Sequence, residues 1–117
     1  PTGPLQMSER DTLNIRRKFN PADEKFEFHF DGLKKESPGA VETVNPWSGI
    51  LTKKVQLSAD EYFLEVNHDN GLTSQMKFKG LLQPINTNDR LSSGEKIGIL
   101  SQDANEFFWN LKNQVVK

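Results

Sequence analysis

Residues 62–78 read YFLEVNHDNGLTSQMKF, and this stretch decides the fold. Its first seven residues alternate and are rich in strand-forming side chains, which indicates the two-residue period of a half-buried strand. Asp69, Asn70 and Gly71 then supply the positive-φ residues of a tight hairpin. The stretch predicts two antiparallel strands joined by a short turn, with residues 71–78 as the returning strand.

Short strands on both sides of this hairpin extend the pattern. Upstream, Phe26, Phe28 and Phe30 alternate with Glu27 and His29, which predicts another half-buried strand. Downstream, short apolar runs separated by polar turns recur at roughly the 8 to 12 residue spacing of all-β folds. These runs cover residues 81–85, 90–91, 96–100 and 107–111. We expect an all-β fold, a small sandwich or barrel of short antiparallel strands.

The start of the chain is predicted to be a lead-in to this β domain. Residues 8–20 read SERDTLNIRRKFN and are mostly polar, and the Asn20–Pro21 step should stop any helix. This segment is therefore either one short helix or an added edge strand. We place the lead-in or linker at residues 1–24 and the β domain at residues 25–117.

The composition narrows the possible functions. The chain has 117 residues, which fits one domain, and its formal net charge of −1 gives no field to attract nucleic acid or anionic lipid. It has no Cys, so disulfides, thiolate metal sites and cysteine nucleophiles are excluded. No run approaches the roughly 18 apolar residues of a membrane span, and no signal peptide appears in these residues, which does not exclude export. We expect neither a nucleic-acid partner nor membrane contact by this segment, which would suit a soluble piece of a longer, anchored protein.

Four strings in order resemble the LytM-type (family M23) peptidase domain. HDNGLTS at residues 68–74 and NDRLSSGEKIG at residues 88–98 are similar to the family's H-x-N-G-[apolar]-x-T and G-D-x-V-x-x-G-x-x-I-G elements. NPWSGIL at residues 45–51 is similar to its A-P-x-x-G-x-V turn, and WNLK at residues 109–112 stands where the family has F-E-[VI]-R. The resemblance covers roughly residues 26–112 and implies the family's small barrel-sandwich-hybrid β fold.

The resemblance also implies where zinc ligands would stand. Members of the family hold zinc with two His and one Asp, and further His residues activate water. The family's first ligand motif is H-x-G-[IL]-D. Aligning its Gly with Gly32 places Phe30 at the His position and Lys34 at the Asp position. Aligning its His with His29 instead places Leu33 at the Asp position. Neither alignment supplies the carboxylate. The family's catalytic His falls on Phe78, and its later H-x-H pair falls on Glu106 and Phe108. We therefore expect no metal, no cofactor and no catalytic residue, with His29 as the one ligand that could survive.

Other interpretations of single residues carry less weight. His68 matches a scaffold position beside the hairpin, so a structural role is expected there. Asp60, Glu61, Glu65 and Glu106 could pair as carboxylates for acid–base chemistry, but no spacing forces any two into one cleft. Residues 76–78 (MKF) invite comparison with the modified lysine of biotinyl and lipoyl carrier domains. In those domains the lysine follows the G-D-x-V-x-x-G turn, whereas here it precedes it.

We expect a degenerate LytM-like domain that acts by contact. The resemblance implies a protein-binding scaffold or regulator of peptidoglycan hydrolysis and cell shape in the bacterial periplasm or envelope, pairing with an active LytM peptidase or another cell-wall protein. Two alternatives stay open: a divergent zinc peptidoglycan endopeptidase and a non-hydrolytic peptidoglycan-binding module. Aromatic side chains that reach the surface near the former zinc cleft would anchor a partner. The candidate partner-binding residues are Phe78, Glu106, Phe107, Phe108 and Trp109.

Overall fold

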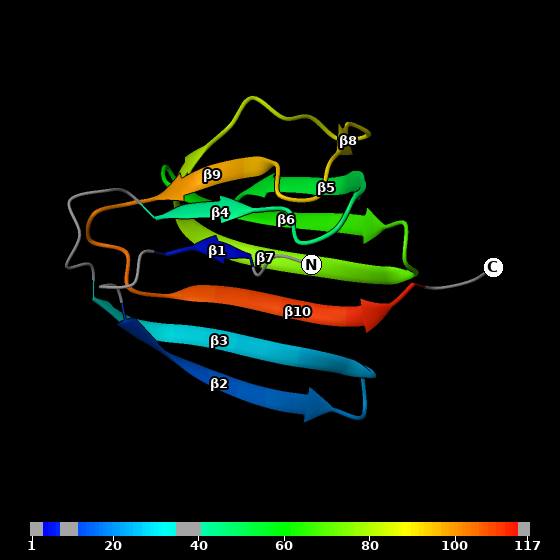
Figure 1. The fold of residues 1–117 in the computed structure, drawn as a ribbon, viewed down its shortest axis with the longest axis horizontal. Helices are drawn as coiled ribbons and strands as arrows, with labels where there is room; N and C mark the ends of the chain where they lie inside the picture. Colours follow the sequence, from blue (N-terminus) through cyan, green and yellow to red (C-terminus); the bar gives the residue numbers. More distant parts are fainter. Residues whose placement is uncertain (1–3, 8–11, 35–40, 115–117) are drawn as a thin grey trace.

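The computed structural model describes residues 4–7, 12–34 and 41–114, and every regular element in them is a strand. The predicted all-β class is confirmed (Figure 1). The strands are β1 (Leu5–Gln6), β2 (Thr12–Asn20), β3 (Lys25–Lys34), β4 (Glu42–Val44), β5 (Gly49–Gln56), β6 (Glu61–His68), β7 (Leu72–Leu82), β8 (Arg90–Leu91), β9 (Lys96–Leu100) and β10 (Phe107–Asn113).

The hairpin that decides the fold is confirmed as β6 and β7. Leu72 follows a turn in which the Gly71 N–H donates to the His68 carbonyl at 3.3 Å, and the Asn70 Oδ1 atom accepts from the Leu72 N–H at 3.0 Å. Of the three turn residues, only Gly71 has a positive φ, of 89°. A turn with one left-handed glycine at its end is a common three-residue hairpin connection.

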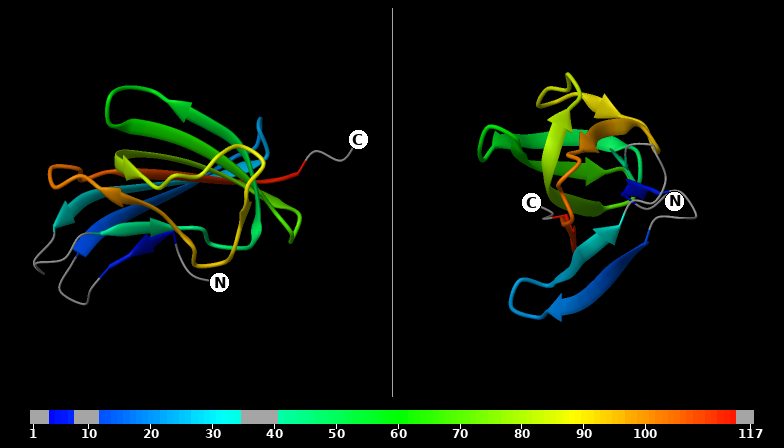
Figure 2. Two further views of the ribbon diagram at one scale, coloured as in Figure 1. Left: turned by 90° about the horizontal axis from the view of Figure 1, so that it is seen from above. Right: turned by 90° about the vertical axis from the view of Figure 1, so that its left-hand side faces the viewer.

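The strand β7 is the branch point of the sheet. Its first part lies between β6 and β10, and Gly80 to Leu82 then pair with β9. One path through the sheet runs β1-β4-β9-β7-β10-β3-β2, while β6, β5 and β8 continue from the other edge of β7. All pairings are antiparallel. The sheet therefore curls into a half-barrel, from which the β2–β3 hairpin projects (Figure 2).

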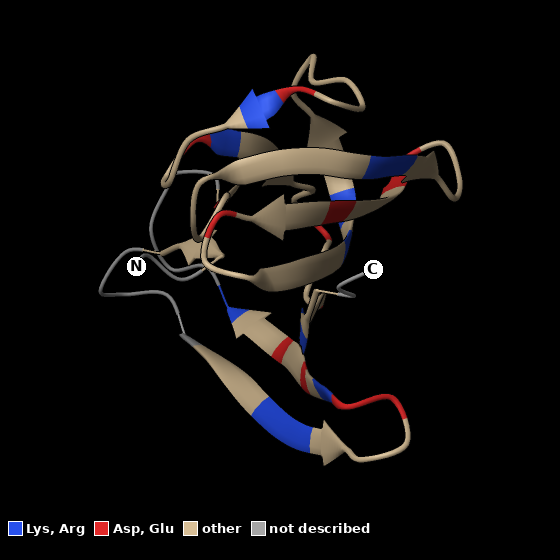
Figure 3. Ribbon diagram, turned by 90° about the vertical axis from the view of Figure 1, so that its right-hand side faces the viewer, with Lys and Arg blue, Asp and Glu red and all other residues tan. Residues whose placement is uncertain are grey.

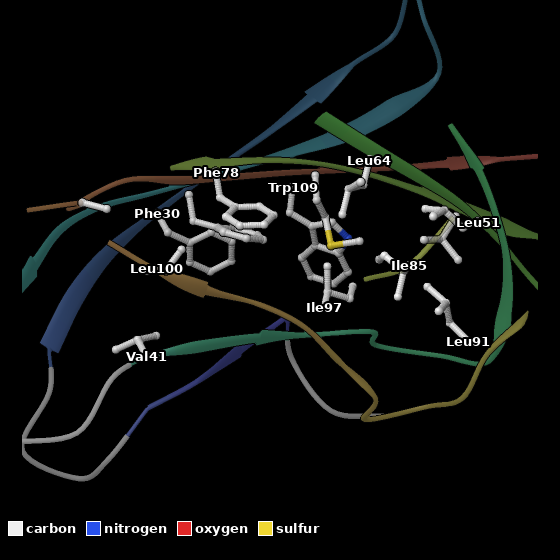
Figure 4. Close-up of a cluster of buried hydrophobic side chains, with 14 residues drawn as sticks. Phe30, Val41, Leu51, Leu64, Phe78, Ile85, Leu91, Ile97, Leu100 and Trp109 are labelled. Atoms are coloured by element: carbon white, nitrogen blue, oxygen red, sulfur yellow. The ribbon is translucent and has the colours of Figure 1, made fainter. Parts of the chain in front are cut away.

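The concave side of the curled sheet holds the core. Side chains that alternate along β3, β6, β7 and β10 point into it, together with residues from β5, β8 and β9, as expected when one face of each strand is buried. Burial is nearly complete for Leu51, Leu64, Val66 and Ile97, each at 0% exposure. Figure 4 shows this cluster, with Phe30 and Phe78 near one end and Leu51 and Leu91 near the other.

The lead-in is part of the same sheet. Of its two open alternatives, the edge strand is found: β2 pairs with β3 from Thr12↔Lys34 to Asn20↔Lys25. The predicted boundary between residues 24 and 25 therefore falls in the turn of a hairpin, and β1 pairs with β4 farther upstream. Residues 1–3 and 8–11 of the lead-in lie outside the described residues.

Candidate functional site

The two faces of β10 separate the candidate residues. The strand lies between β3 and β7, with Phe107 directly opposite Phe30 and Phe78, and Phe108 directly opposite His29 and Lys77. Because successive side chains of a strand point to opposite faces, Phe107 points into the core and Phe108 points to the convex, outer face. Of these two adjacent phenylalanines, Phe107 is therefore a core residue and Phe108 is a residue of the open outer surface.

Three of the predicted partner-binding residues are in the core. Phe78, Phe107 and Trp109 are exposed by 3%, 1% and 9%. The Phe107 ring centroid lies 5.8 Å from that of Phe30 and 6.1 Å from that of Phe78, so these rings pack on one another. Partner binding requires that these rings reach the surface, and they do not, because the inward half of the alternation buries them. Of the candidate residues, Glu106 is exposed and Phe108 is half-buried on the outer face.

The positions that match the family's ligands do not converge. Phe30 and Phe78 point into the core, Glu106 and Phe108 lie on the outer face, and Lys34 is exposed at the end of β3. Of the two alignments of the first motif, only the one with His29 places the first His beside Glu106 and Phe108. Within the described residues, no three His, Asp or Glu side chains gather in a group that could hold a metal ion.

His29 is held between a carboxylate and a ring. Its Nε2 atom lies 2.8 Å from the Glu106 Oε2 atom. Its ring stacks on Phe108 with 4.4 Å between centroids and 9° between planes, and the Lys77 Nζ atom lies 4.7 Å from the centroid of the same phenyl ring. A cation over an aromatic face is an attractive contact. We call His29, Lys77, Glu106 and Phe108 the outer cluster.

Three members of the outer cluster, His29, Phe108 and Lys77, belong to a row that crosses the sheet. Each member of the row is directly paired with the next one, on the neighbouring strand. The row consists of Arg16, His29, Phe108, Lys77, Phe63 and Val55. Cationic and aromatic side chains therefore lie side by side on an open sheet face.

Two open depressions flank Phe108. One, of about 400 Å³, reaches from Lys77 and Phe108 toward Lys79 and Asp103. The other, of about 480 Å³, reaches from the same two residues toward Lys18 on β2. Lys79 donates to Asp103 at 2.8 Å, and this hydrogen bond raises the pKa of Lys79. Phe108 is thus a ridge between two hollows of mixed charge.

His68 has the structural role that the sequence predicted. It is 2% exposed, with Nδ1 2.7 Å from the Trp47 carbonyl and Nε2 2.6 Å from the Ser74 hydroxyl. Because a carbonyl only accepts, Nδ1 carries the proton and Nε2 accepts from Ser74. The Trp109 indole N–H in turn donates to the Ser74 Oγ atom at 3.0 Å. Sequence reasoning missed this network. The HDNGLTS string holds His68 and Ser74, but Trp47 and Trp109 lie far from it along the chain.

The other singled-out side chains do not form a second site. Glu65 accepts from Gln75 and Thr52, and the Ser58 hydroxyl donates to both Asp60 and Glu61. Glu61 and Glu106 line the same open depression, but Glu106 contacts His29 rather than another of these carboxylates. Lys77 stands in the middle of β7 rather than at a hairpin tip, so its placement contradicts the carrier-domain interpretation.

No family model matches this chain, and no curated protein or solved structure gives a significant match. In the described part of the chain, no helix is long and apolar enough to cross a membrane. The site must therefore be interpreted from its own chemistry. That chemistry offers an aromatic ring, an imidazole, an ammonium group and a carboxylate, which suits contact with a ligand surface.

Proposed function

We propose that this chain is a non-catalytic, LytM-like binding domain of a bacterial cell envelope, and that its outer cluster binds a protein partner. The observation that carries the proposal is the placement of Phe108. A half-buried ring held by His29 and Lys77 presents apolar area at low entropic cost, and aromatic residues dominate the energetics of protein interfaces. The favoured partner is an active LytM peptidase or another cell-wall protein.

The turn motifs support the LytM-like part of the proposal. HDNGLTS forms the β6–β7 hairpin, and residues 45–51 form the bend that leads into β5. Residues 88–98 hold two left-handed positions, Asn88 at φ 79° and Gly94 at φ 81°, on either side of β8. Three of the four strings therefore include a turn, two of them with left-handed positions, and the fourth, WNLK, lies within β10.

The side chains at the ligand positions support a non-catalytic role. His29 contacts Glu106 on one side and Phe108 on the other. A phenyl ring cannot coordinate zinc, and the nearby Lys77 ammonium repels a divalent cation. Zinc content of the purified protein tests this part. We expect far less than one zinc per chain, and one tightly bound zinc would overturn it in favour of a divergent endopeptidase whose activity His29→Ala and a chelator should abolish.

Binding of the protein partner is tested by removing the phenyl ring of Phe108. The affinity of the purified domain for the active LytM peptidase of its own organism is measured by calorimetry for the unchanged protein, for Phe108→Ala and for Phe26→Ala. Phe26 is a matched exposed phenylalanine on the opposite face. Phe108→Ala should weaken binding at least about tenfold, with Phe26→Ala unchanged. Equal affinities for all three proteins contradict the outer cluster as the interface.

Peptidoglycan is the second candidate ligand. The depressions beside Phe108 offer both Lys79 and Glu106, which match the carboxylates and amines of cell-wall peptides. Co-sedimentation with purified sacculi distinguishes this role from protein binding. Retention on sacculi that is lost in Phe108→Ala and kept in Phe26→Ala assigns the outer cluster to peptidoglycan.

A further inference from the structure

A different surface, the free edge of β2, has the properties of a docking site. β2 is the last strand of the sheet path, and no described strand pairs with its outer edge. It is nine residues long and lies on the outside of the projecting hairpin (Figure 2). An edge strand presents unpaired N–H and C=O groups that can accept another strand.

All the charged side chains of β2 are positive. Residues 12–20 read TLNIRRKFN, with three adjacent cations and no acidic residue; Figure 3 shows the cationic segment on the outermost strand of the hairpin. Arg16 pairs with Asp31 at 2.9 Å. Among the described residues, Arg17 and Lys18 have no ion-pair partner.

The two faces of β2 carry different kinds of side chain. Arg16 and Lys18 lie on the outer face, in register with His29 and Glu27. Ile15, Arg17 and Phe19 lie on the other face, where Ile15 and Phe19 have exposures of 55% and 51%. Phe19 packs on Phe26, with 5.0 Å between ring centroids, and both rings border an open depression of about 460 Å³. A strand that needed only protection from aggregation would not leave these apolar groups in water.

We propose that the free edge of β2 binds an extended partner segment in which acidic and apolar residues alternate. Side chains of an added strand point to the same two faces as those of β2. Acidic residues would lie beside Arg16 and Lys18, and apolar residues beside Ile15 and Phe19. Opposite charges on neighbouring strands attract, and like charges repel.

A second copy of this chain does not fit the edge. Antiparallel pairing of two β2 strands over most of their length would bring residues 16–18 of one copy against or diagonal to the same cations of the other. The positive charge that blocks self-pairing is the charge that selects an acidic partner. The occupant is therefore a different chain or a segment of different sequence.

The test uses a fluorescein-labelled peptide of four Glu-Val repeats and fluorescence anisotropy. We expect saturable binding that weakens with salt, and no binding of a matched peptide of four Lys-Val repeats. In an added strand all valine N–H groups point to one side and all glutamate N–H groups to the other. N-methylation of one set should therefore abolish binding, while N-methylation of the other set leaves it. Equal binding of both methylated peptides overturns strand addition.

Matched protein variants locate the site. Lys18→Glu should weaken peptide binding about tenfold, whereas Lys53→Glu, the same charge change on an exposed residue of β5, should leave it within about twofold. Loss of binding in Lys53→Glu with retention in Lys18→Glu would place the peptide on β5 and overturn the proposal. Circular dichroism of both variants verifies that each keeps the strand content of the unchanged protein.

Discussion

The Ser74 hydroxyl lies 2.6 Å from the Nε2 atom of His68 and joins two buried rings into one hydrogen-bond chain. Ser74 donates to His68 and accepts from the Trp109 indole, while His68 donates from Nδ1 to the Trp47 carbonyl. The chain links the β6–β7 hairpin to β10 and to the bend before β5. It adds buried side-chain hydrogen bonds between three parts of the half-barrel that backbone pairing already joins.

Ser74→Ala should therefore cost much more than an ordinary serine change. It leaves the His68 Nε2 atom and the Trp109 N–H unsatisfied inside the core, and we expect a loss of roughly 2–4 kcal/mol in the free energy of unfolding. Urea denaturation followed by tryptophan fluorescence measures it. Ser92→Ala, on an exposed loop residue, is the control and should change stability by less than about 0.5 kcal/mol. Equal effects of the two changes would contradict the network.

Acidification should destabilise the protein through His68. Burial lowers the pKa of His68, although the hydrogen bond to Trp47 and the charge of Asp69 oppose the shift. The unfolded chain has the ordinary value of about 6.5, so between the two pKa values the unfolded state binds more protons. Stability is then full above that ordinary value, falls as the pH drops below it, and levels off below the folded pKa. Urea titrations between about pH 7.5 and pH 5.5 should show this slope.

A histidine variant assigns that slope. His68→Gln removes the titrating group and should flatten the pH dependence over that interval, even though it lowers stability at every pH. Ser92→Ala, which removes no titrating group, is the control and should keep the slope of the unchanged protein. A slope that persists in His68→Gln would assign the effect to another group.

The neighbouring residues Phe107 and Phe108 should respond very differently to truncation. Phe107 is 1% exposed and packs on Phe30 and Phe78, so Phe107→Ala should cost roughly 3–5 kcal/mol of unfolding free energy. Phe108 has solvent on one side, and Phe108→Ala should cost about 1 kcal/mol. Chemical denaturation of both variants measures the contrast. A larger cost at Phe108 would reverse the assignment of faces on β10.

The elements that could be predicted from the sequence are those with one polar face. The β6–β7 hairpin and the alternating phenylalanines of β3 show the two-residue period that one buried face requires. The sequence does not decide between helix and strand for the segment that forms β2, because an edge strand in water needs few apolar residues. Only its pairing with β3 decides between the two.

The candidate site could be predicted only in part. Residues 107–109 read FFW, and a run that is apolar on both faces gives no sign of which ring is inside. The register of β10 between β3 and β7 decides it, and that register depends on contacts between residues far apart along the chain. For the same reason the sequence did not reveal that His29 stacks on Phe108, or that His68, Ser74 and Trp109 share one network.

Alanine substitutions at Gly49 and Gly71 should distinguish two reasons why a position needs glycine: close approach of a neighbouring backbone and a positive φ. A Cβ atom on Gly49 would lie 2.2 Å from the Asn67 carbonyl oxygen and 2.7 Å from the His68 Cα atom, and backbone atoms of a central strand cannot move aside. Gly49→Ala should therefore cost roughly 3 kcal/mol. A Cβ atom on Gly71 meets nothing within 4 Å, so Gly71→Ala suffers only from its φ of 89°, at about 1 kcal/mol. Thermal unfolding of the two variants gives the order, and a Gly71 variant less stable than the Gly49 variant would refute the close approach of β5 to β6.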